Sequence, residues 1–460
     1  MDIAIQNPWW INANAIENDE KVKEALSKNT KVAYSLDKDD NLIILGPRQV
    51  GKSTMFKLCI HDLITAKKIN PKNVFYFSCE PLKDKKELID VIASFLEFSK
   101  ETQGKKYIFL DEVSIVKEWE YSIKYFLETM RKSEQILVSG SSAMLLKKGI
   151  ERMPGRKIET ELFLPLSFRE FLLHFASNEL KQELSKNYFG YDSFDLKKIH
   201  SSSMNLQPFL PELNSKLSTY LKTGGFLKAI YEFLEKGSIS ESTYEAYTKW
   251  ILSDLSKLGK REIIFKSIIH GIIKNYCSRF SLHSMAKEME IPSHVTVSEY
   301  LELLQSILLT NNLYQVALHK TLPALRKERK CYFLDPFLYS VFKGYSVGKY
   351  SDYSTGNEDK LIEGVICETL ARFNRINLDT SHFLWYFFSG NETDFAVKAG
   401  SNVVGIELKW QEKADKRDFN NFRSFRHKLL LTKRDFGFEQ DLLVVPASIF
   451  IALAKHRQGL

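Results

Sequence analysis

The feature that most constrains the fold is a glycine-rich loop at residues 46–53. The run 41–46 is apolar and ends in glycine, and residues 52–66 continue with apolar side chains at helical spacing. The loop reads Gly-Pro-Arg-Gln-Val-Gly-Lys-Ser, a complete G-x-x-x-x-G-K-[ST] motif. Strand, loop and helix in this order predict a backbone that curls around phosphate groups, with its amide hydrogens and the helix N-terminus facing them.

The residues of this loop have separate expected roles. Lys52 would place its charge on the β- and γ-phosphates of a nucleotide, expected to be ATP, and Ser53 would offer its hydroxyl to Mg²⁺. Thr54 is a neighbour of the site more than a ligand. The candidate nucleotide-binding residues of the segment are consecutive: Gly46, Pro47, Arg48, Gln49, Val50, Gly51, Lys52, Ser53 and Thr54.

A second apolar run, at residues 106–110, is followed by two carboxylates. Open α/β sheets bind ligands at the carboxyl ends of their strands, so Asp111 is the expected partner of the Mg²⁺ ion. Glu112 comes next and is the candidate general base that polarises the attacking water, which implies hydrolysis. The alternative is that Glu112 is a solvated charge of the loop.

Two more residues are candidates for the terminal phosphate. After an apolar run at 136–139 we choose Ser141 as the hydroxyl that senses the γ-phosphate, although it would serve equally as the N-cap of a helix at 143–148. Arg156 follows a glycine turn and precedes the next expected strand. It is a candidate arginine finger, in its own subunit or for a neighbour, or else a surface charge.

The chain is too long for a single hydrophobic core, so we expect several domains. Strands alternate with helices up to about residue 170, which predicts a parallel, helix-covered sheet of the α/β class. A helical region follows. Then come helices and strands in the order of a winged helix-turn-helix, with strands near 314–317 and 331–334, and finally aromatic-rich strands of a separate α/β unit. The expected domains are an N-terminal segment (1–35), a P-loop ATPase core (36–170), a helical lid (171–260), a winged helix (261–334) and a C-terminal α/β domain (335–460).

Composition narrows the class of protein. No run approaches the roughly 18 apolar residues that a membrane span needs, and nothing at the start marks the chain for secretion, so we expect a cytoplasmic protein without membrane contact. Five scattered cysteines lack the spacing of a zinc site or of a disulfide framework. A net charge of +8 is compatible with nucleic-acid binding but is small for 460 residues.

Taken in order, these motifs resemble those of the prokaryotic AAA+ ATPases often called archaeal ATPases. The matching segments are Gly46–Thr54, Leu110–Glu112, Ser139–Ser141, Gly155–Arg156, Leu164–Phe171, Asn7–Trp10 and Tyr220–Phe226. The resemblance covers nearly the whole chain and implies a C-terminal half that ends in a restriction-endonuclease-like domain. Leu227 stands where relatives carry a proline after the glycine pair. For Trp9 and Trp10 we favour core packing over a platform for adenine.

The C-terminal domain contains a second candidate site. Its sequence predicts a β-hairpin that turns at Ala399–Asn402, and in that register Asp394 lies opposite Glu407 and Glu392 lies opposite Lys409, all on one face. Two facing carboxylates repel each other unless a cation or a proton lies between them. The hairpin therefore predicts a bound metal ion.

This arrangement resembles the D-(x)n-E-x-K motif of nucleases. Asp394 and Glu407 would bind Mg²⁺, and Lys409 would orient or activate the water that attacks a phosphodiester. Glu363, on the preceding predicted helix, matches the helical glutamate of the family and is a further candidate ligand. The alternative is a solvated hairpin with an ion pair between Glu392 and Lys409.

The expected recognition helix of the winged helix, 294–305, contains two glutamates and no arginine or lysine. It is poorly equipped to read the major groove. Basic residues cluster instead at 326–330, in the expected wing, where they suit non-specific contact with phosphates. We slightly prefer a winged helix that docks a protein partner.

The sequence thus predicts an ATP-hydrolysing AAA+ protein, dependent on Mg²⁺, whose nucleotide state is coupled to a winged-helix and nuclease-like module that acts on DNA. The alternative is a nucleotide-gated switch or scaffold whose silent nuclease-like domain binds a partner or nucleic acid without cutting it. Besides ATP, the expected partners are DNA and a second copy or another protein bound through the winged helix.

Overall fold

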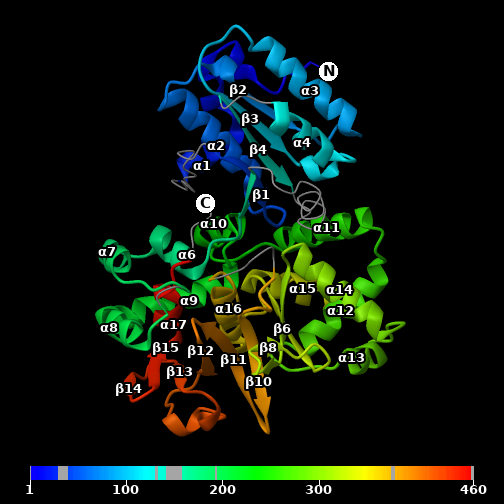
Figure 1. Cartoon of the computed structure of the whole chain (residues 1–460). Coiled ribbons are helices and arrows are strands. Elements are labelled where there is room, and N and C mark those ends of the chain that lie inside the picture. The colour runs from blue at the N-terminus through cyan, green and yellow to red at the C-terminus, as the bar shows by residue number, and fades with distance from the viewer. Residues whose placement is uncertain are drawn as a thin grey trace. The chain divides into compact units, whose positions relative to one another are not determined.

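A computed structural model describes residues 2–28, 40–129, 133–140, 158–191, 194–373 and 379–456 of the chain (Figure 1). The chain forms two compact units, residues 1–164 and residues 165–458. The five domains expected from the sequence are a finer division than these two units. No helix among the described residues has the length and apolar character needed to cross a membrane.

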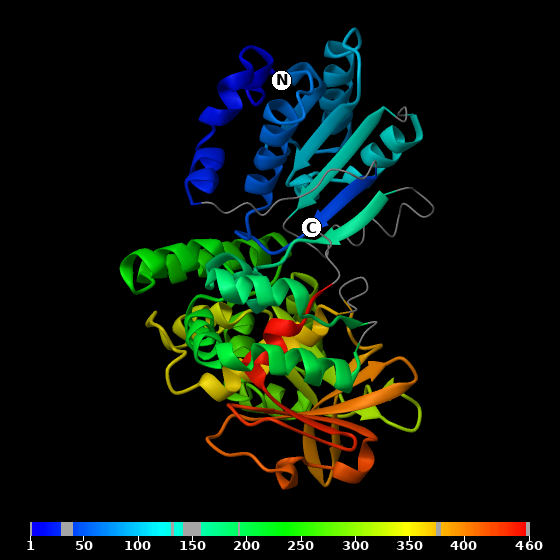
Figure 2. The same ribbon diagram turned by 90° about the vertical axis from the view of Figure 1, so that its left-hand side faces the viewer.

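The first unit is built on a five-stranded parallel sheet with strand order β2-β3-β4-β1-β5 (Figures 1 and 2). Its strands are β1 (Asn41–Leu45), β2 (Val74–Ser78), β3 (Lys106–Asp111), β4 (Glu134–Gly140) and β5 (Ile158–Leu162). Its helices are α1 (Glu20–Ser27), α2 (Lys52–Thr65), α3 (Lys85–Phe98) and α4 (Trp119–Thr129), with short 3-10 turns η1 (Pro8–Trp10), η2 (Ala13–Asn18), η3 (Pro71–Asn73) and η4 (Val113–Ile115). The first four strands are apolar and buried along most of their length, as strands of helix-covered parallel sheets are. The predicted parallel α/β sheet is confirmed.

The N-terminal segment covers the edge strand β2. The Asn7 side chain donates to the Tyr76 carbonyl and accepts from its amide, at 2.9 and 2.7 Å, in the way that a neighbouring strand would. Trp9 and Trp10 both donate through Nε1 to the Val74 carbonyl, and both are buried. These contacts fit the favoured interpretation of the two tryptophans as packing residues, and they protect an edge that would otherwise expose unpaired backbone groups.

The second unit begins with a helical region, as expected for residues 171–260. Its helices are α6 (Phe168–Phe175), α7 (Asn178–Lys186), α8 (Leu196–Leu206), α9 (Leu210–Thr223), α10 (Leu227–Lys236) and α11 (Glu241–Lys257), with the turn η6 (Gln207–Phe209). The C-terminal helix α17 (Ala447–Leu453) packs against α6, α8 and α9. Arg169, on α6, donates to the Ala452 carbonyl at 2.7 Å. The helical region and the end of the chain therefore share one core.

The middle of this unit has the expected order of three helices and paired strands. It contains α12 (Glu262–Lys274), α13 (Leu282–Glu288), α14 (His294–Ser306), β6 (Thr310–Tyr314), β7 (Val316–Ala317), β8 (Leu322–Pro323) and β9 (Arg329–Phe333). Strand β6 pairs with β9, and β7 pairs with β8, all antiparallel. Strand β6 begins earlier than predicted, because it includes Asn311 and Asn312, a residue type that is uncommon in strands. Both asparagines are buried, and their side-chain amides donate to Glu368 and to the Leu301 carbonyl, respectively.

The last part carries a six-stranded mixed sheet with order β10-β11-β12-β13-β15-β14, orange to red in Figure 2. It comprises α15 (Pro336–Val347), α16 (Glu358–Ala371), β10 (Leu384–Ser389), β11 (Asn391–Ala399), β12 (Asn402–Lys409), β13 (His427–Thr432), β14 (Gly437–Glu439) and β15 (Leu442–Pro446), with turns η7 (Lys416–Asp418) and η8 (Phe422–Ser424). The predicted hairpin is confirmed, because Lys398 pairs with Val403 and Ala399 with Asn402. Val316 of β7 lies in the same buried cluster as Trp385 of β10, so the middle region and this sheet are packed together.

Candidate functional site

The glycine-rich loop joins β1 to α2, and its backbone conformation depends on its glycines. Gly51 has φ 106° and Gln49 has φ 62°, both in the left-handed region. Gly46 needs its lack of a side chain for a different reason, since a β-carbon there would lie 2.2 Å from the Phe163 carbonyl oxygen. Helix α2 begins directly after the loop, at Lys52. Ser53 and Thr54 lie half-buried in its first turn.

Lys52 is buried inside its own loop. Its side chain is 5% exposed, and Nζ donates to the Gly46 and Pro47 carbonyls, each at 2.9 Å. The two carbonyl groups, which are neutral acceptors, thus hold the Lys52 ammonium group within the loop. A phosphate oxygen would be a stronger acceptor than a carbonyl, because the hydrogen bond would then join two opposite charges.

Asp111 lies at the end of β3, where hydroxyl groups from the two neighbouring strands converge on it. Tyr76 of β2 donates to Oδ2 at 2.9 Å, and Ser139 of β4 donates to Oδ1. The carboxylate is 2% exposed. Burial raises the pKa of Tyr76, and the charge of Asp111 raises this pKa further. The Tyr76 hydroxyl therefore stays protonated, and together with Ser139 it holds the carboxylate in one orientation.

Glu112 has an uncommon backbone conformation for a residue with a side chain, at φ 54°. Its amide donates to Ser139 Oγ at 3.3 Å, and its side chain is half-buried. Left-handed backbone outside glycine costs on the order of 1–3 kcal/mol and concentrates at functional sites. The left-handed turn thus fixes the direction in which the Glu112 side chain projects from the end of β3.

The structure adds residues that the sequence analysis did not select. Tyr76 and Ser139 are the hydroxyl partners of Asp111, and Lys57 lies beneath Tyr76 with Nζ 3.9 Å from the centre of its ring. Burial lowers the pKa of Lys57, while the nearby charge of Asp19 opposes that shift. No local sequence signal marks Tyr76 or Ser139, because both reach Asp111 only through the order β2-β3-β4 of the sheet. The candidates Ser141 and Arg156 lie outside the described residues.

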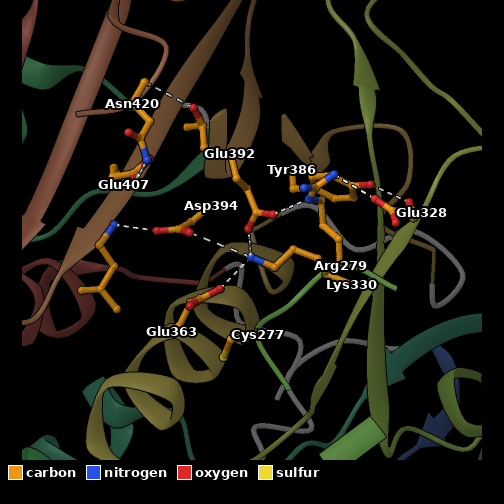
Figure 3. A network of polar contacts seen from close by, with 12 residues as sticks. Cys277, Arg279, Glu328, Lys330, Glu363, Tyr386, Glu392, Asp394, Glu407 and Asn420 are labelled. Atoms are coloured by element: carbon orange, nitrogen blue, oxygen red, sulfur yellow. Dashed lines mark hydrogen bonds and ion pairs between the residues drawn. The ribbon is translucent and has the colours of Figure 1, made fainter. Parts of the chain in front are cut away.

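The second candidate site is a buried cluster of charges in the C-terminal sheet (Figure 3). Lys330 of β9 is fully buried, and its Nζ lies 2.8 Å from Glu363, 2.7 Å from Glu392 and 3.9 Å from Asp394. Burial alone would lower the pKa of Lys330, but the three carboxylates outweigh it and raise the pKa. The cation among these carboxylates is therefore a lysine side chain from a different element.

Glu407 lies in the same cluster and is 2% exposed. Its Oε1 accepts from Lys409 Nζ at 2.9 Å and from Asn420 Nδ2 at 2.8 Å, whereas its buried Oε2 has no hydrogen-bond partner among the residues that the structure describes. Burial raises the pKa of Glu407 to about 7, although the charge of Lys409 opposes this. Burial and the charge of Glu363 hold the pKa of Asp394 well above its usual range, and Asp394 accepts from the Leu408 amide.

The structure thus brings together the four residues of the nuclease-like motif. Their pairing differs from the predicted one in two ways. The regular pairing of the hairpin stops at Phe395 and Ile406, one residue short of the two acids. The alternative ion pair between Glu392 and Lys409 is replaced, because Glu392 pairs with Lys330 and Arg279. Lys330 itself was expected in an exposed wing, but β9 carries it into the core.

The two candidate sites differ in how well they suit a metal ion. At the first, a strand-end carboxylate and a serine hydroxyl are hard oxygen ligands of the kind that Mg²⁺ prefers. At the second, Lys330 already engages Glu363 and approaches Asp394. Across the part of the chain that the structure describes, no group of three or more histidine, cysteine or acidic side chains is arranged to hold a metal. Near the carboxylates of the second site, the positive charge is supplied by Lys330.

Comparisons with protein families match three separate parts of the chain. Residues 38–172 match the model of an AAA domain. Residues 214–347 and residues 358–450 match two further models, each described as a domain of unknown function. The match to an AAA domain thus includes the glycine-rich loop and Asp111.

Curated relatives are similar over part of their length. An uncharacterized protein of Methanocaldococcus jannaschii is 24% identical over 293 residues, covering 62% of this chain and 59% of the relative. An uncharacterized protein of Haemophilus influenzae is 24% identical over 287 residues, covering 59% of this chain and 62% of the relative. The match thus spans about three fifths of the length of each of these two relatives.

Solved structures are similar at a low level. PCH-2 of C. elegans has a TM-score of 0.26 at 13% identity, over 50% of this chain and 61% of that one. The ORC1 protein of Aeropyrum pernix, solved in complex with DNA, has a TM-score of 0.30 at 11% identity, over 74% of this chain and 97% of that one. Scores this low assign neither fold nor function. The family match and the geometry of the loop and of Asp111 identify residues 38–172 as an ATPase-like domain of the AAA type.

Proposed function

We propose that the chain binds ATP with Mg²⁺ at the loop 46–53 and Asp111, and hydrolyses it. The observation that carries this proposal is the buried Asp111 carboxylate at the end of β3, held by the hydroxyls of Tyr76 and Ser139. It belongs to the same sheet as the loop that keeps Lys52 ready for a phosphate. Parallel sheets bind ligands at the carboxyl ends of their strands, and a carboxylate with a purely structural role would not need to lie there.

The expected mechanism follows from these positions. Lys52 would exchange its two carbonyl acceptors for phosphate oxygens. Ser53 and Asp111 would hold the Mg²⁺, which would supply positive charge next to the phosphates. Glu112 accepts a proton from water as the water oxygen bonds to the γ-phosphorus and the bond to the bridging oxygen breaks. Ser141 and Arg156 remain proposed contacts of the γ-phosphate.

Removal of the metal tests this proposal. The purified full chain should release phosphate from ATP in the presence of Mg²⁺, and release should stop when EDTA is added in excess of the metal. Restoring Mg²⁺ should restore the rate, which separates loss of the ion from loss of the fold. Phosphate release that continues at an unchanged rate in EDTA would contradict the proposed roles of Ser53 and Asp111.

We further propose that residues 261–334 form a winged helix and that the sheet of residues 335–460 is a nuclease-like domain that does not cut. The first part is supported by three helices followed by the β6–β9 ladder and the β7–β8 hairpin. The second is supported by Lys330, whose ammonium group supplies the positive charge that the acids would otherwise take from a metal. On this account ATP turnover changes the state of a module that binds a partner or nucleic acid.

A cleavage assay separates this account from a nuclease. Plasmid and single-stranded DNA incubated with the protein, ATP and either Mg²⁺ or Mn²⁺ should remain intact. Asp394→Ala and Lys409→Ala serve as matched variants, since a contaminating nuclease would cut equally in all three samples. Cleavage by the wild type that both substitutions abolish would contradict the silent domain and restore the nuclease assignment.

A further inference from the structure

The second unit contains an open pocket of about 610 Å³ that belongs to neither candidate site. Its walls come from segments far apart in the sequence. They include Arg279 and His283 before and within α13, His294 at the start of α14, Arg326 and Lys327 between β8 and β9, and Phe388 near the end of β10. The pocket therefore exists only because the middle region and the C-terminal sheet pack together.

The pocket carries positive charges that nearby carboxylates neutralise only in part. Arg279 is neutralised, because Nε pairs with Glu392 and Nη1 pairs with Glu328, each at 2.8 Å (Figure 3). Glu328 is the single acid among the residues that line the pocket. Arg326 and Lys327 are exposed, and neither forms an ion pair with any residue that the structure describes. Their two charges remain for a ligand.

Flat groups face the same pocket. The rings of His283 and His294 lie 3.9 Å apart between centroids with 30° between their planes. The guanidinium of Arg279 lies 3.6 Å from the centre of the Phe388 ring. Nucleic-acid bases stack on aromatic rings and on guanidinium planes, and such stacking tolerates any sequence. Charges for phosphates and flat groups for bases thus occur together.

The adjoining helix argues against a duplex. Glu299 and Glu302 are exposed farther along α14, where the phosphates of a duplex lying along the helix would meet them. The cationic wall is confined to the N-terminal end of that helix. A strand a few nucleotides long would reach Arg326 and Lys327 without meeting the two acids.

We propose that this pocket binds single-stranded nucleic acid, with phosphates at Arg326 and Lys327 and bases against the flat groups. The inference rests on the proposed non-cutting C-terminal unit, to which it assigns a ligand and a place. An acidic protein segment would match the charge but has no bases for the histidine pair and the Phe388–Arg279 stack. Arg279 links the pocket to the buried cluster, since Glu392 pairs with both Arg279 and Lys330.

The test measures binding of a fluorescent dT20 strand to the full chain by anisotropy, without ATP. Arg326→Ala/Lys327→Ala should bind about tenfold more weakly than wild type at 100 mM salt. The slope of log affinity against log salt should fall by about 1.4, because each single-strand phosphate contact contributes about 0.7. The matched control is Lys197→Ala/Lys198→Ala, which removes two adjacent exposed charges from α8 and should bind as wild type does.

Three outcomes would overturn the inference. The first is no measurable binding of dT20 by the wild type. The second is equal weakening in both double variants, which would mean that net charge alone acts. The third is displacement of dT20 by poly-glutamate at lower concentration than by unlabelled dT20, which would identify an acidic protein partner. DNA cleavage in the earlier assay would instead contradict the silent domain and leave this binding result intact.

Discussion

Glu112→Gln should bind ATP as tightly as the wild type while its turnover falls by about 10²–10⁴-fold. Glutamine keeps the size of the side chain but cannot accept a proton from the attacking water. The left-handed turn and the hydrogen bond to Ser139 involve the backbone, so the substitution preserves them. Phosphate release and equilibrium binding of a fluorescent ATP analogue, measured on the same preparation, separate the two effects.

A matched control for this variant is Glu101→Gln. It removes the same charge from the same unit at an exposed position, and turnover should be unchanged. If Glu112→Gln instead keeps its rate within about twofold of the wild type, Glu112 is a solvated loop charge. The hydrolytic base would then have to be sought elsewhere.

Lys330→Met should destabilise the second unit by about 3–5 kcal/mol. Methionine fills similar space, but it leaves Glu363, Glu392 and Asp394 close together without the cation that now lies among them. Buried charges that lose their partner are far more costly than the intact pair is favourable. Urea unfolding followed by circular dichroism measures the loss.

The control for this stability change is Lys320→Met, an exposed lysine on the turn between β7 and β8, where the expected change is within about 0.5 kcal/mol. A loss below about 1 kcal/mol in Lys330→Met would mean that the carboxylates are already protonated or hydrated without the lysine. In that case Lys330 would not take the place of a metal.

Local patterns in the sequence predicted those parts of the structure that depend on local rules. The loop at 46–53 has Gly51 at a left-handed position and Gly46 where a β-carbon would clash, and both glycines are visible in the sequence. The hairpin register follows from its turn and from the alternation of faces, so Lys398 and Val403 could be paired in advance. The parallel sheet follows from apolar runs that alternate with helices.

Contacts between distant elements could not be predicted in this way. Lys330 lies within a basic run that looks solvent-exposed, and only the packing of β9 against α16 and β11 makes it a buried cation. Tyr76 and Ser139 meet Asp111 because of the strand order, which depends on the whole sheet and not on any one segment. The shared core of Val316 and Trp385 is another contact of this kind, since it joins residues on either side of the boundary expected at 334–335.

The most direct test of the account is equilibrium binding of ATP to the purified full chain in Mg²⁺, measured by titration calorimetry beside Lys52→Ala. The account predicts saturable binding of one ATP per chain by the wild type. Because Lys52→Ala removes a charge-assisted contact with the phosphates, its affinity should fall at least about tenfold while its fold is unchanged. A folded wild-type protein that takes up no ATP, or a Lys52→Ala variant that binds ATP equally well, would contradict it.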